Sequence, residues 1–345
     1  MDVRDRFLER TFEKLGLPYP KPSAYALELA RKYGYLPYMI ERYMHIFGSR
    51  EELIEFLEAV EKGLPRYIRC NTLAIKNCMD LAERLREVDI IVKPVPWLPH
   101  AFRVENNSSA AGRLGSTLEY LLGYYYIQGL GSMAVSIALN PKPGEAVADL
   151  AAAPGGKTTH IAQLMNNDGI ILSVEKNPVR AMSLSANIQR MRVKIAAVLV
   201  KDILELPIKE KFDKVLLDAP CTGEGLLPIK KERKTSKDLG DIARMHELQV
   251  KLLEKSLQFV KPGGVLVYST CSIAPEENEF VIDKVLSSRS DVELEKITGI
   301  MVGSPGLTEF MGYRLRDGLA NCLRLYPHKN GSEGFFMCRL RRRGK

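Results

Sequence analysis

The second half of the chain alternates between strand-like and helix-like segments, and this alternation restricts the fold more than any other feature. Strand-like patterns occupy residues 146–150, 170–174, 195–200, 212–217 and 265–269, and a helical pattern covers 178–191. Strands that alternate with helices predict a mostly parallel sheet with helices on both faces. Residues 322–326 and 334–339 are close enough in sequence to form an antiparallel hairpin at the sheet edge. The expected fold class is therefore α/β.

The first part of the 345-residue chain has a different pattern, which predicts two smaller units ahead of the sheet. Residues 1–63 have the pattern of short helices, one of which begins with a capping box at 49–52. Residues 64–128 contain strand-like runs on either side of a helix-like run. We therefore expect a helical N-terminal extension (1–63), a small α+β domain (64–128) and a sheet domain (129–345).

The composition predicts a folded protein of the cytoplasm, without membrane contact. Hydrophobic residues make up 46% of the chain. No run approaches the roughly 18 apolar residues of a membrane span, and the N-terminus lacks the apolar region of a signal peptide. The net charge of +8 favours a polyanionic partner without identifying it. The spacing of the six cysteines indicates neither a zinc site nor a secreted disulfide framework.

The α+β domain carries residues that suit a nucleic acid. Arg66 and Arg69, on an expected strand, could meet phosphates, and the tyrosines at 124–126 could stack on bases. Packing in the domain core is the alternative role for aromatic residues in such a run. The pattern leaves both roles open.

A glycine-rich loop follows the first strand of the sheet domain, over residues 149–159 (DLAAAPGGKTT). Its small residues let a ligand approach the backbone, and the helix after it offers free N–H groups to an anion. A P-loop would need glycine at Ala151, and GxGxxG is absent, which disfavours a triphosphate and a dinucleotide. Glu175 ends the second strand and can accept both hydroxyls of a ribose, while Asp202 follows the third and can accept an adenine amino group. A nucleoside-bearing ligand fits these residues best.

Two cysteines, Cys221 and Cys271, follow the fourth and fifth strands, and Asp218 precedes the first of them. Carboxyl ends of parallel strands meet at one sheet edge, so these residues should lie beside the loop. A lone cysteine at a strand end is more often a small buried residue than a nucleophile. Two cysteines, an acid and a nucleoside ligand instead suggest methyl transfer to a carbon such as C5 of cytosine. That carbon becomes nucleophilic when a thiolate adds to C6.

Several stretches of the sequence resemble the NOL/NOP/Sun family of RNA 5-methylcytosine methyltransferases. They are DLAAAPGGKTT, LLDAPCTGEG, KTSKD and YSTCSIAPEENE, with RYIRCNTL, PWLPHAF and LYPHKNGSEGFF on either side. The resemblance is strongest to archaeal tRNA-modifying members. It implies a class I S-adenosylmethionine-dependent methyltransferase with a Rossmann-like, mostly parallel seven-stranded sheet, in which the α+β domain resembles an RNA-recognition motif.

The resemblance also implies roles for individual residues. Cys271 would be the nucleophile that adds to the base, Cys221 would assist breakdown of the adduct, and Asp218 would hydrogen-bond the cytosine. Glu175 would contact the ribose of S-adenosylmethionine, Asp202 would lie near the adenine and Arg180 would support the pocket. The methionine part would be held by Ala151, Ala152, Ala153, Pro154, Gly155, Gly156 and Lys157. The expected substrate is tRNA, with rRNA as the alternative, and we expect a monomer without a metal ion.

Three rival interpretations remain open at this stage. Cys221 could attack in place of Cys271, the chain could be a non-catalytic RNA-binding factor for ribosome assembly, or it could be an NTPase. The chain departs from the family pattern at Ala151, where many members have cysteine, and at Glu175, where aspartate is common. Neither departure changes the expected contacts.

Two charged stretches flank the expected site. Lys234 and Lys237, in the lysine-rich run 229–241, could contact an RNA backbone or belong to an ordinary solvated loop. The acidic residues after Pro275 are predicted to cap and charge the first turn of a helix; they are Glu276, Glu277 and Glu279.

Overall fold

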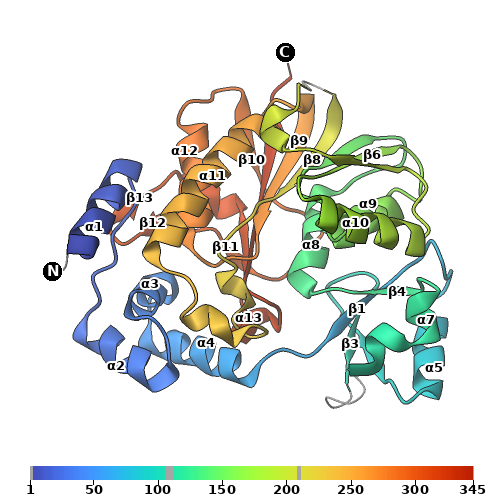
Figure 1. Ribbon diagram of the computed structural model, residues 1–345, viewed down its shortest axis with the longest axis horizontal. Helices are drawn as coiled ribbons and strands as arrows, with labels where there is room; N and C mark the ends of the chain where they lie inside the picture. The colour runs from blue at the N-terminus through green and yellow to red at the C-terminus, as the bar shows by residue number, and fades with distance from the viewer. Residues whose placement is uncertain (1–2, 106–111, 208–210, 345) are drawn as a thin grey trace.

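The computed structural model describes residues 3–105, 112–207 and 211–344, which form a helical group, a small sheet and a large sheet (Figure 1). The helical group comprises α1 (Val3–Leu15), α2 (Ala24–Tyr33), α3 (Pro37–Phe47) and α4 (Arg50–Lys62). None of the helices in these ranges is long and apolar enough to span a membrane. The domain boundaries expected at residues 63 and 128 stay a prediction.

The helical group packs against the large sheet domain. Ser49 caps α4 by accepting a hydrogen bond from the Glu52 amide, as the capping-box pattern predicts. The Arg42 side chain on α3 is fully buried and donates to Glu224 and Glu276 of the large domain. The two carboxylates offset the cost of burying the guanidinium, because an unpaired buried charge is strongly destabilising. The N-terminal helices are therefore held to the large domain by an apolar core that they share with it and by the two ion pairs of Arg42.

The small sheet has the strand order β2–β3–β1–β4 and is antiparallel throughout. Its strands are β1 (Tyr67–Cys70), β2 (Val92–Pro94), β3 (Ala101–Val104) and β4 (Tyr125–Ile127), and α5 (Cys78–Glu87) and α7 (Leu118–Leu121) accompany them. The expected strand, helix and strand of the α+β domain are confirmed. Ile68, Leu81, Phe102 and Tyr125 are among the residues of a separate apolar core in this part.

Arg69 and Tyr125 face the protein interior, so the RNA contacts considered for them are wrong. The Arg69 side chain is fully buried and donates to Thr159 Oγ1 at 2.8 Å and Gln163 Oε1 at 3.1 Å. Its burial lowers the pKa of the guanidinium to about 9. The Tyr125 hydroxyl donates to the Leu114 carbonyl inside the small domain. All four residues of β1 are buried because the strand lies between β3 and β4, whereas Arg66, just before the strand, is exposed.

The large sheet has nine strands in the described residues. The order is β11–β14–β15–β9–β8–β5–β6–β7, and β10 also pairs with β15. Five strands are parallel: β5 (Ala146–Asp149), β6 (Ile170–Glu175), β7 (Ala196–Val200), β8 (Phe212–Asp218) and β9 (Val260–Thr270). The antiparallel strands are β10 (Val292–Glu295), β11 (Ser304–Pro305), β14 (Leu323–Leu325) and β15 (Phe335–Arg342). A two-stranded ribbon, β12 (Glu309–Phe310) and β13 (Tyr313–Arg314), lies apart.

The expected seven-stranded core is present, and two strands that the sequence pattern missed extend it. The predicted hairpin is β14 and β15, but it does not form the edge of the sheet. β15 also pairs with β9 and with β10, and β14 also pairs with β11. β10 and β11 have only four and two residues. A run that short has too little alternation for a sequence pattern to reveal it.

Alternate residues of the central strands pack against different helix layers. On β8, Val215 and Leu217 join the core that contains α11 (Leu239–Leu257) and α12 (Glu279–Leu286), whereas Leu216 joins the core of α8 (Leu130–Leu139) and α9 (Gly156–Leu164). α10 (Pro178–Arg190) lies beside α9 in Figure 1. The strands are thus buried on both faces, which explains their nearly continuous apolar sequences.

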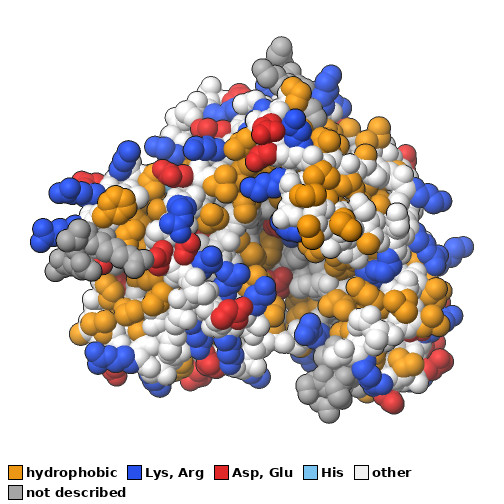
Figure 2. Space-filling model, in the orientation of Figure 1, with side chains coloured by type: hydrophobic (Ala, Val, Ile, Leu, Met, Phe, Trp, Pro, Cys, Tyr) orange, Lys and Arg blue, Asp and Glu red, His pale blue; other side chains and the backbone are white. Residues whose placement is uncertain are grey.

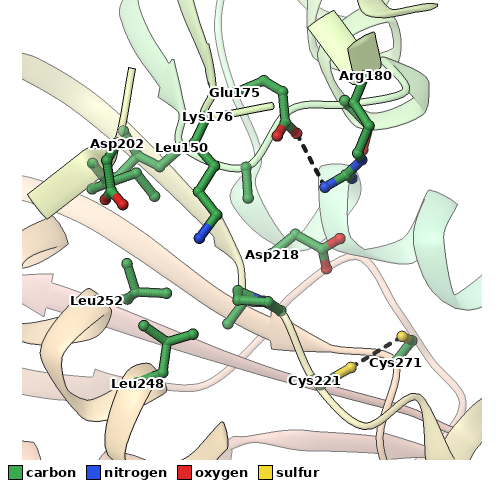
Figure 3. A pocket seen from close by; sticks show the side chains of 15 residues that line it. Leu150, Glu175, Lys176, Arg180, Asp202, Asp218, Cys221, Leu248, Leu252 and Cys271 are labelled. Atoms are coloured by element: carbon green, nitrogen blue, oxygen red, sulfur yellow. Dashed lines mark hydrogen bonds and ion pairs between the residues drawn. The ribbon is translucent and has the colours of Figure 1, made fainter. Parts of the chain in front are cut away.

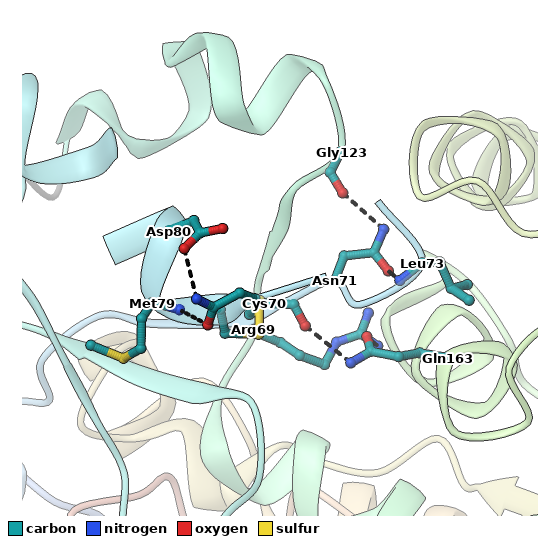
Figure 4. Close-up of a disulfide and its surroundings, with 10 residues drawn as sticks. Arg69, Cys70, Asn71, Leu73, Met79, Asp80, Gly123 and Gln163 are labelled. Carbon is teal, nitrogen blue, oxygen red and sulfur yellow. Dashed lines mark hydrogen bonds between the residues drawn. A yellow bond between two sulfur atoms is a disulfide. The ribbon is translucent and has the colours of Figure 1, made fainter. Parts of the chain in front are cut away.

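Four of the six cysteines are paired, which their spacing did not indicate. Cys70, at the end of β1, is joined to Cys78, at the start of α5 (Figure 4), and Cys322 is joined to Cys338 on β15. The fold brings these partners together across a loop in one case and across neighbouring strands in the other. Cys221 and Cys271 are the free cysteines among the described residues.

Candidate active site

A cavity of about 250 Å³ lies at the carboxyl ends of the parallel strands (Figure 3). Most of the residues proposed from the sequence line it: Ala151, Ala153, Glu175, Arg180, Asp202, Asp218, Cys221 and Cys271. Ala152, Pro154, Gly156 and Lys157 line a second cavity of about 230 Å³, which shares Ala151, Ala153 and Asp218 with the first. Gly155 lines neither cavity, but its φ of 105° makes the turn into α9.

Two acidic residues and an arginine form the far side of the first cavity. Glu175 is only 3% exposed; its Oε1 accepts from the Asn177 amide at 2.9 Å, and its Oε2 lies 3.3 Å from Arg180. Arg180 also donates to the Ala153 carbonyl, so it links the acid to the loop. Asp202 caps the short helix η2 (Ile203–Glu205) through the Leu204 amide. A carboxylate at the second strand end, small loop residues and a helix N-terminus fit the ribose and methionine portions of S-adenosylmethionine.

Asp218 connects the loop side of the site to the cysteine side. Its Oδ2 accepts from Lys157 Nζ at 2.8 Å, and its Oδ1 accepts from Ser269 Oγ at 2.7 Å. Burial acts to lower the pKa of Lys157, but the charge and the hydrogen bond of Asp218, together with the charge of Asp149, outweigh burial and the pKa is raised. Lys157 therefore remains a cation here, and it also donates to Ser132 Oγ. Asp218 is held in a fixed position by groups from both sides.

The two free cysteines touch. Their Sγ atoms are 3.1 Å apart, although 50 residues separate them in sequence. The contact with Cys271, together with burial, raises the pKa of the Cys221 thiol. Either sulfur can be the donor in this contact.

Some residues of the site were not found from the sequence. Leu248 and Leu252 form an apolar wall of the first cavity, and their spacing of one helical turn on α11 is a signal that would have placed them together. Lys176 also lines this cavity, and Gln128 and Ser132 line the second. These three residues belong to no pattern that indicates chemistry.

The acidic residues after Pro275 differ from the prediction. Glu276 and Glu277 precede α12 in a short 3₁₀ turn, and all three carboxylates are fully buried. Glu276 binds Arg42, Glu277 binds Thr222 and Ser272, and Glu279 binds Arg324. Glu279 lies in the first turn of α12 as predicted, and all three residues have the expected structural role, but Glu276 and Glu277 lie before that helix and are held by a buried ion pair and buried hydrogen bonds.

The lysine-rich run is also less available than expected. Lys234 is bound to the Tyr33 carbonyl and to the Glu61 carboxylate of the helical group.

The described residues contain no group of three or more potential metal ligands.

Comparison with known proteins gives the same class as the fold and the site, an RNA-modifying methyltransferase. Residues 136–341 match the family described as 16S rRNA methyltransferase RsmB/F, and residues 36–129 match the N-terminal domain of 16S rRNA methyltransferase RsmF. The chain therefore belongs to the RsmB/F methyltransferase family. The class I methyltransferase fold with its S-adenosylmethionine dependence follows, as does the expected small N-terminal domain.

Individual relatives agree with this family. The chain is 38% identical to the 26S rRNA (cytosine-C(5))-methyltransferase nsun-1 of Caenorhabditis elegans, over 91% of this chain and 48% of the relative. It is 36% identical to the tRNA (cytosine(49)-C(5))-methyltransferase of Pyrococcus abyssi, over 88% and 95%. A crystal structure of a methyltransferase homolog protein from Pyrococcus horikoshii superposes with a TM-score of 0.80 at 42% identity, covering 93% of this chain and 99% of that one. The chain spans 39–55% of the length of the four eukaryotic rRNA enzymes it matches.

Proposed function

We propose that this protein methylates carbon 5 of a cytidine in RNA, with S-adenosylmethionine as methyl donor. The observation that carries the proposal is the contact between Cys221 and Cys271 at the edge of the cavity that Glu175 and Asp202 line. Two adjacent thiols beside a methyl donor suit a carbon that becomes nucleophilic only while a thiolate is bound to its neighbour. An NTPase would not need them, and Ala151 removes a glycine that a P-loop needs.

In the proposed reaction the Cys271 thiolate donates an electron pair to C6 of the base, and the π electrons of the C5–C6 bond become available at C5. S-adenosylmethionine supplies an electrophilic methyl group when it is bound. Transfer of the methyl group to C5 leaves a neutral thioether. A base then takes the proton from C5, the electron pair of that C–H bond re-forms the C5–C6 double bond and Cys271 is expelled as thiolate. Cys221, in contact with Cys271, assists this last step, and Asp218 hydrogen-bonds the base.

A series of cavities that share lining residues, called the trough below, supports an RNA substrate. The second cavity shares Gln128 with a third of about 340 Å³, and the third shares Tyr67 with a fourth of about 300 Å³ beside Trp97. Lys62 and Arg66 line the third cavity and are exposed, so they can meet phosphates. Figure 2 shows a hollow near the centre of this face with lysine and arginine side chains around it. A cytidine must leave its stack to reach the thiols, so a single strand in this trough fits the chemistry.

We propose tRNA as the substrate. The tRNA enzyme of Pyrococcus abyssi is matched over 95% of its length, whereas the eukaryotic rRNA enzymes contain long regions without a counterpart here. Ribosomal RNA is the second candidate, because the nematode and human rRNA enzymes are each 38% identical to the chain. We also propose that the protein acts in the cytoplasm as a monomer.

The experiment is incubation of tRNA and rRNA with the protein and S-adenosylmethionine, followed by bisulfite mapping. The proposal expects 5-methylcytosine at defined tRNA positions. Methylation of rRNA alone would select the second candidate, and no transfer from tritiated cofactor to either RNA would leave the non-catalytic RNA-binding factor.

The trough is tested with Arg66→Ala and Lys62→Ala. Each should weaken RNA binding and reduce the dependence of log K on log salt by about one. Lys142→Ala is the matched control, because Lys142 is an exposed lysine before the start of β5, at the opposite edge of the sheet.

A further inference from the structure

The sheet does not by itself place the two catalytic thiols. β8 ends at Asp218 and β9 ends at Thr270, and their register pairs Asp218 with Ser269. Both cysteines lie beyond these ends, in segments without regular structure at 219–223 and 271–274. Backbone hydrogen bonds lie on either side of Cys221, from the Ala219 amide to the Ser269 carbonyl at 2.8 Å and from the Gly225 amide to the Cys271 carbonyl at 3.0 Å. The Sγ atoms of Cys221 and Cys271 are 3.1 Å apart, and side chains that bind the residues between these two backbone bonds also contribute to holding that separation.

The carboxylate of Glu277 lies where the two cysteine segments meet. Thr222, the residue after Cys221, donates to it from its amide at 2.8 Å and from its hydroxyl at 2.6 Å. Ser272, the residue after Cys271, donates to it from its hydroxyl at 2.5 Å. One side chain thus binds the immediate neighbour of each cysteine.

Further contacts fix Glu277 and complete the support of Cys221. Gln249 on α11 donates from Nε2 to the Glu277 carboxylate at 3.2 Å and to the Pro220 carbonyl at 2.8 Å, so both neighbours of Cys221 are held. The Tyr268 hydroxyl donates to the Glu277 carbonyl at 2.6 Å. The carboxylate is fully buried and makes no ion pair with any described residue.

A carboxylate suits this position because two oxygens accept four donors. Burial raises the pKa of Glu277, and the hydrogen bonds from Ser272 and Thr222 oppose that shift. Burying a carboxyl group without a cation is costly, and its hydrogen bonds offset the cost. A glutamine at position 277 would place its amide nitrogen opposite the hydroxyls of Thr222 and Ser272, which now donate hydrogen bonds. Both hydroxyl groups would then have to rotate so that their oxygens accept.

We propose that Glu277 is a positioning residue that holds the Cys221 and Cys271 segments at the separation needed for thiol chemistry. The consequence for catalysis rests on the proposed function, in which Cys221 acts on the adduct formed by Cys271. A displacement of about 1 Å in such a geometry can cost roughly 10²-fold in rate. Removing the carboxylate should separate the thiols without removing either one.

The first test measures the thiol pair directly and needs no RNA. Purified protein is equilibrated with reduced and oxidised glutathione. Glutathione disulfide is reduced to two thiols as Cys221 and Cys271 are oxidised to a disulfide, which peptide mass spectrometry distinguishes from the Cys70–Cys78 and Cys322–Cys338 pairs. In Glu277→Ala the effective concentration of the pair should fall by about tenfold or more.

The control is Glu279→Gln, which changes another fully buried carboxylate, two residues away. Glu279 binds Arg324 and the Leu307 amide, not the residues next to the cysteines. This variant should lose stability but keep the wild-type thiol equilibrium. Because Glu277→Ala could fail to fold, the double variant Thr222→Val/Ser272→Ala is measured as well; it keeps Glu277 and removes the two hydroxyl donors.

The second readout is catalytic. Glu277→Ala and the double variant should lower kcat roughly 10²-fold, with the KM for RNA and the cofactor Kd changed by less than about threefold. Wild-type thiol equilibrium in the double variant, or in folded Glu277→Ala, would overturn the proposal. If the wild-type protein transferred no methyl group, the proposed function would fail while the thiol equilibrium still decided the role of Glu277.

Discussion

The two sides of the catalytic cavity are built differently. On the cofactor side, small loop residues expose the backbone, and Glu175 and Asp202 each bind an amide two residues ahead of themselves. On the cysteine side, the segments lie beyond the strand ends, and buried side chains from α11 and from the turn before α12 hold them together with two backbone hydrogen bonds. The cofactor side should therefore tolerate changes of small side chains, whereas the cysteine side should not.

The largest expected effect is the loss of the attacking thiol. Cys271→Ala should lower single-turnover methyl transfer by at least about 10⁴-fold, because it removes the thiol that is proposed to form the adduct. Cofactor affinity, measured by calorimetry, should stay near the wild-type value, since Cys271 only borders the cavity. If Cys271→Ala retained methyl transfer, Cys271 would not be the attacking thiol, and the cysteine side would tolerate the loss of a side chain as the cofactor side does.

A smaller loss is expected on the cofactor side. Glu175→Ala removes the proposed ribose acceptor, and hydrogen bonds to a charged group contribute about 1.5–3 kcal/mol. The cofactor Kd should therefore rise by roughly 10- to 100-fold, with kcat at saturating cofactor nearly unchanged. A fall in kcat with an unchanged Kd would place Glu175 outside the cofactor site.

The two thiols should also differ from each other. Contact with Cys271 and burial raise the pKa of Cys221, so its thiolate fraction at a given pH lies below that of an ordinary cysteine. Brief treatment with iodoacetamide at pH 8 should label Cys271 about tenfold faster than Cys221, as peptide mapping would show. Raising the pH toward the pKa of Cys221 should narrow this ratio. Equal labelling at all pH values would contradict the assignment.

The smallest effect is expected at Ala151. Its contribution to the loop is made by the backbone, so Ala151→Cys should change the cofactor Kd by less than about threefold. A large loss of affinity would show that the cofactor side also depends on side chains.

The sequence allowed the residues of the candidate site to be located because they occupy strand ends. The five parallel strands, the loop at 151–157 and Glu175, Asp202, Asp218, Cys221 and Cys271 follow from apolar runs and the residues that end them. Contacts between distant segments could not be predicted this way. Arg69 looked like a surface cation and is buried against α9, and Glu277 looked like a helix cap and joins two loops. Such roles depend on tertiary packing, which periodicity does not encode.

The most direct test of the central claim is to trap the covalent intermediate. Cys221→Ala protein, incubated with substrate tRNA and S-adenosylmethionine, should give a protein–RNA band that survives a denaturing gel, because Cys271 attacks and its release is impaired. Adding Cys271→Ala should abolish the band. A band from Cys271→Ala alone would exchange the roles of the two cysteines, and no band from either variant would contradict the assigned division of labour.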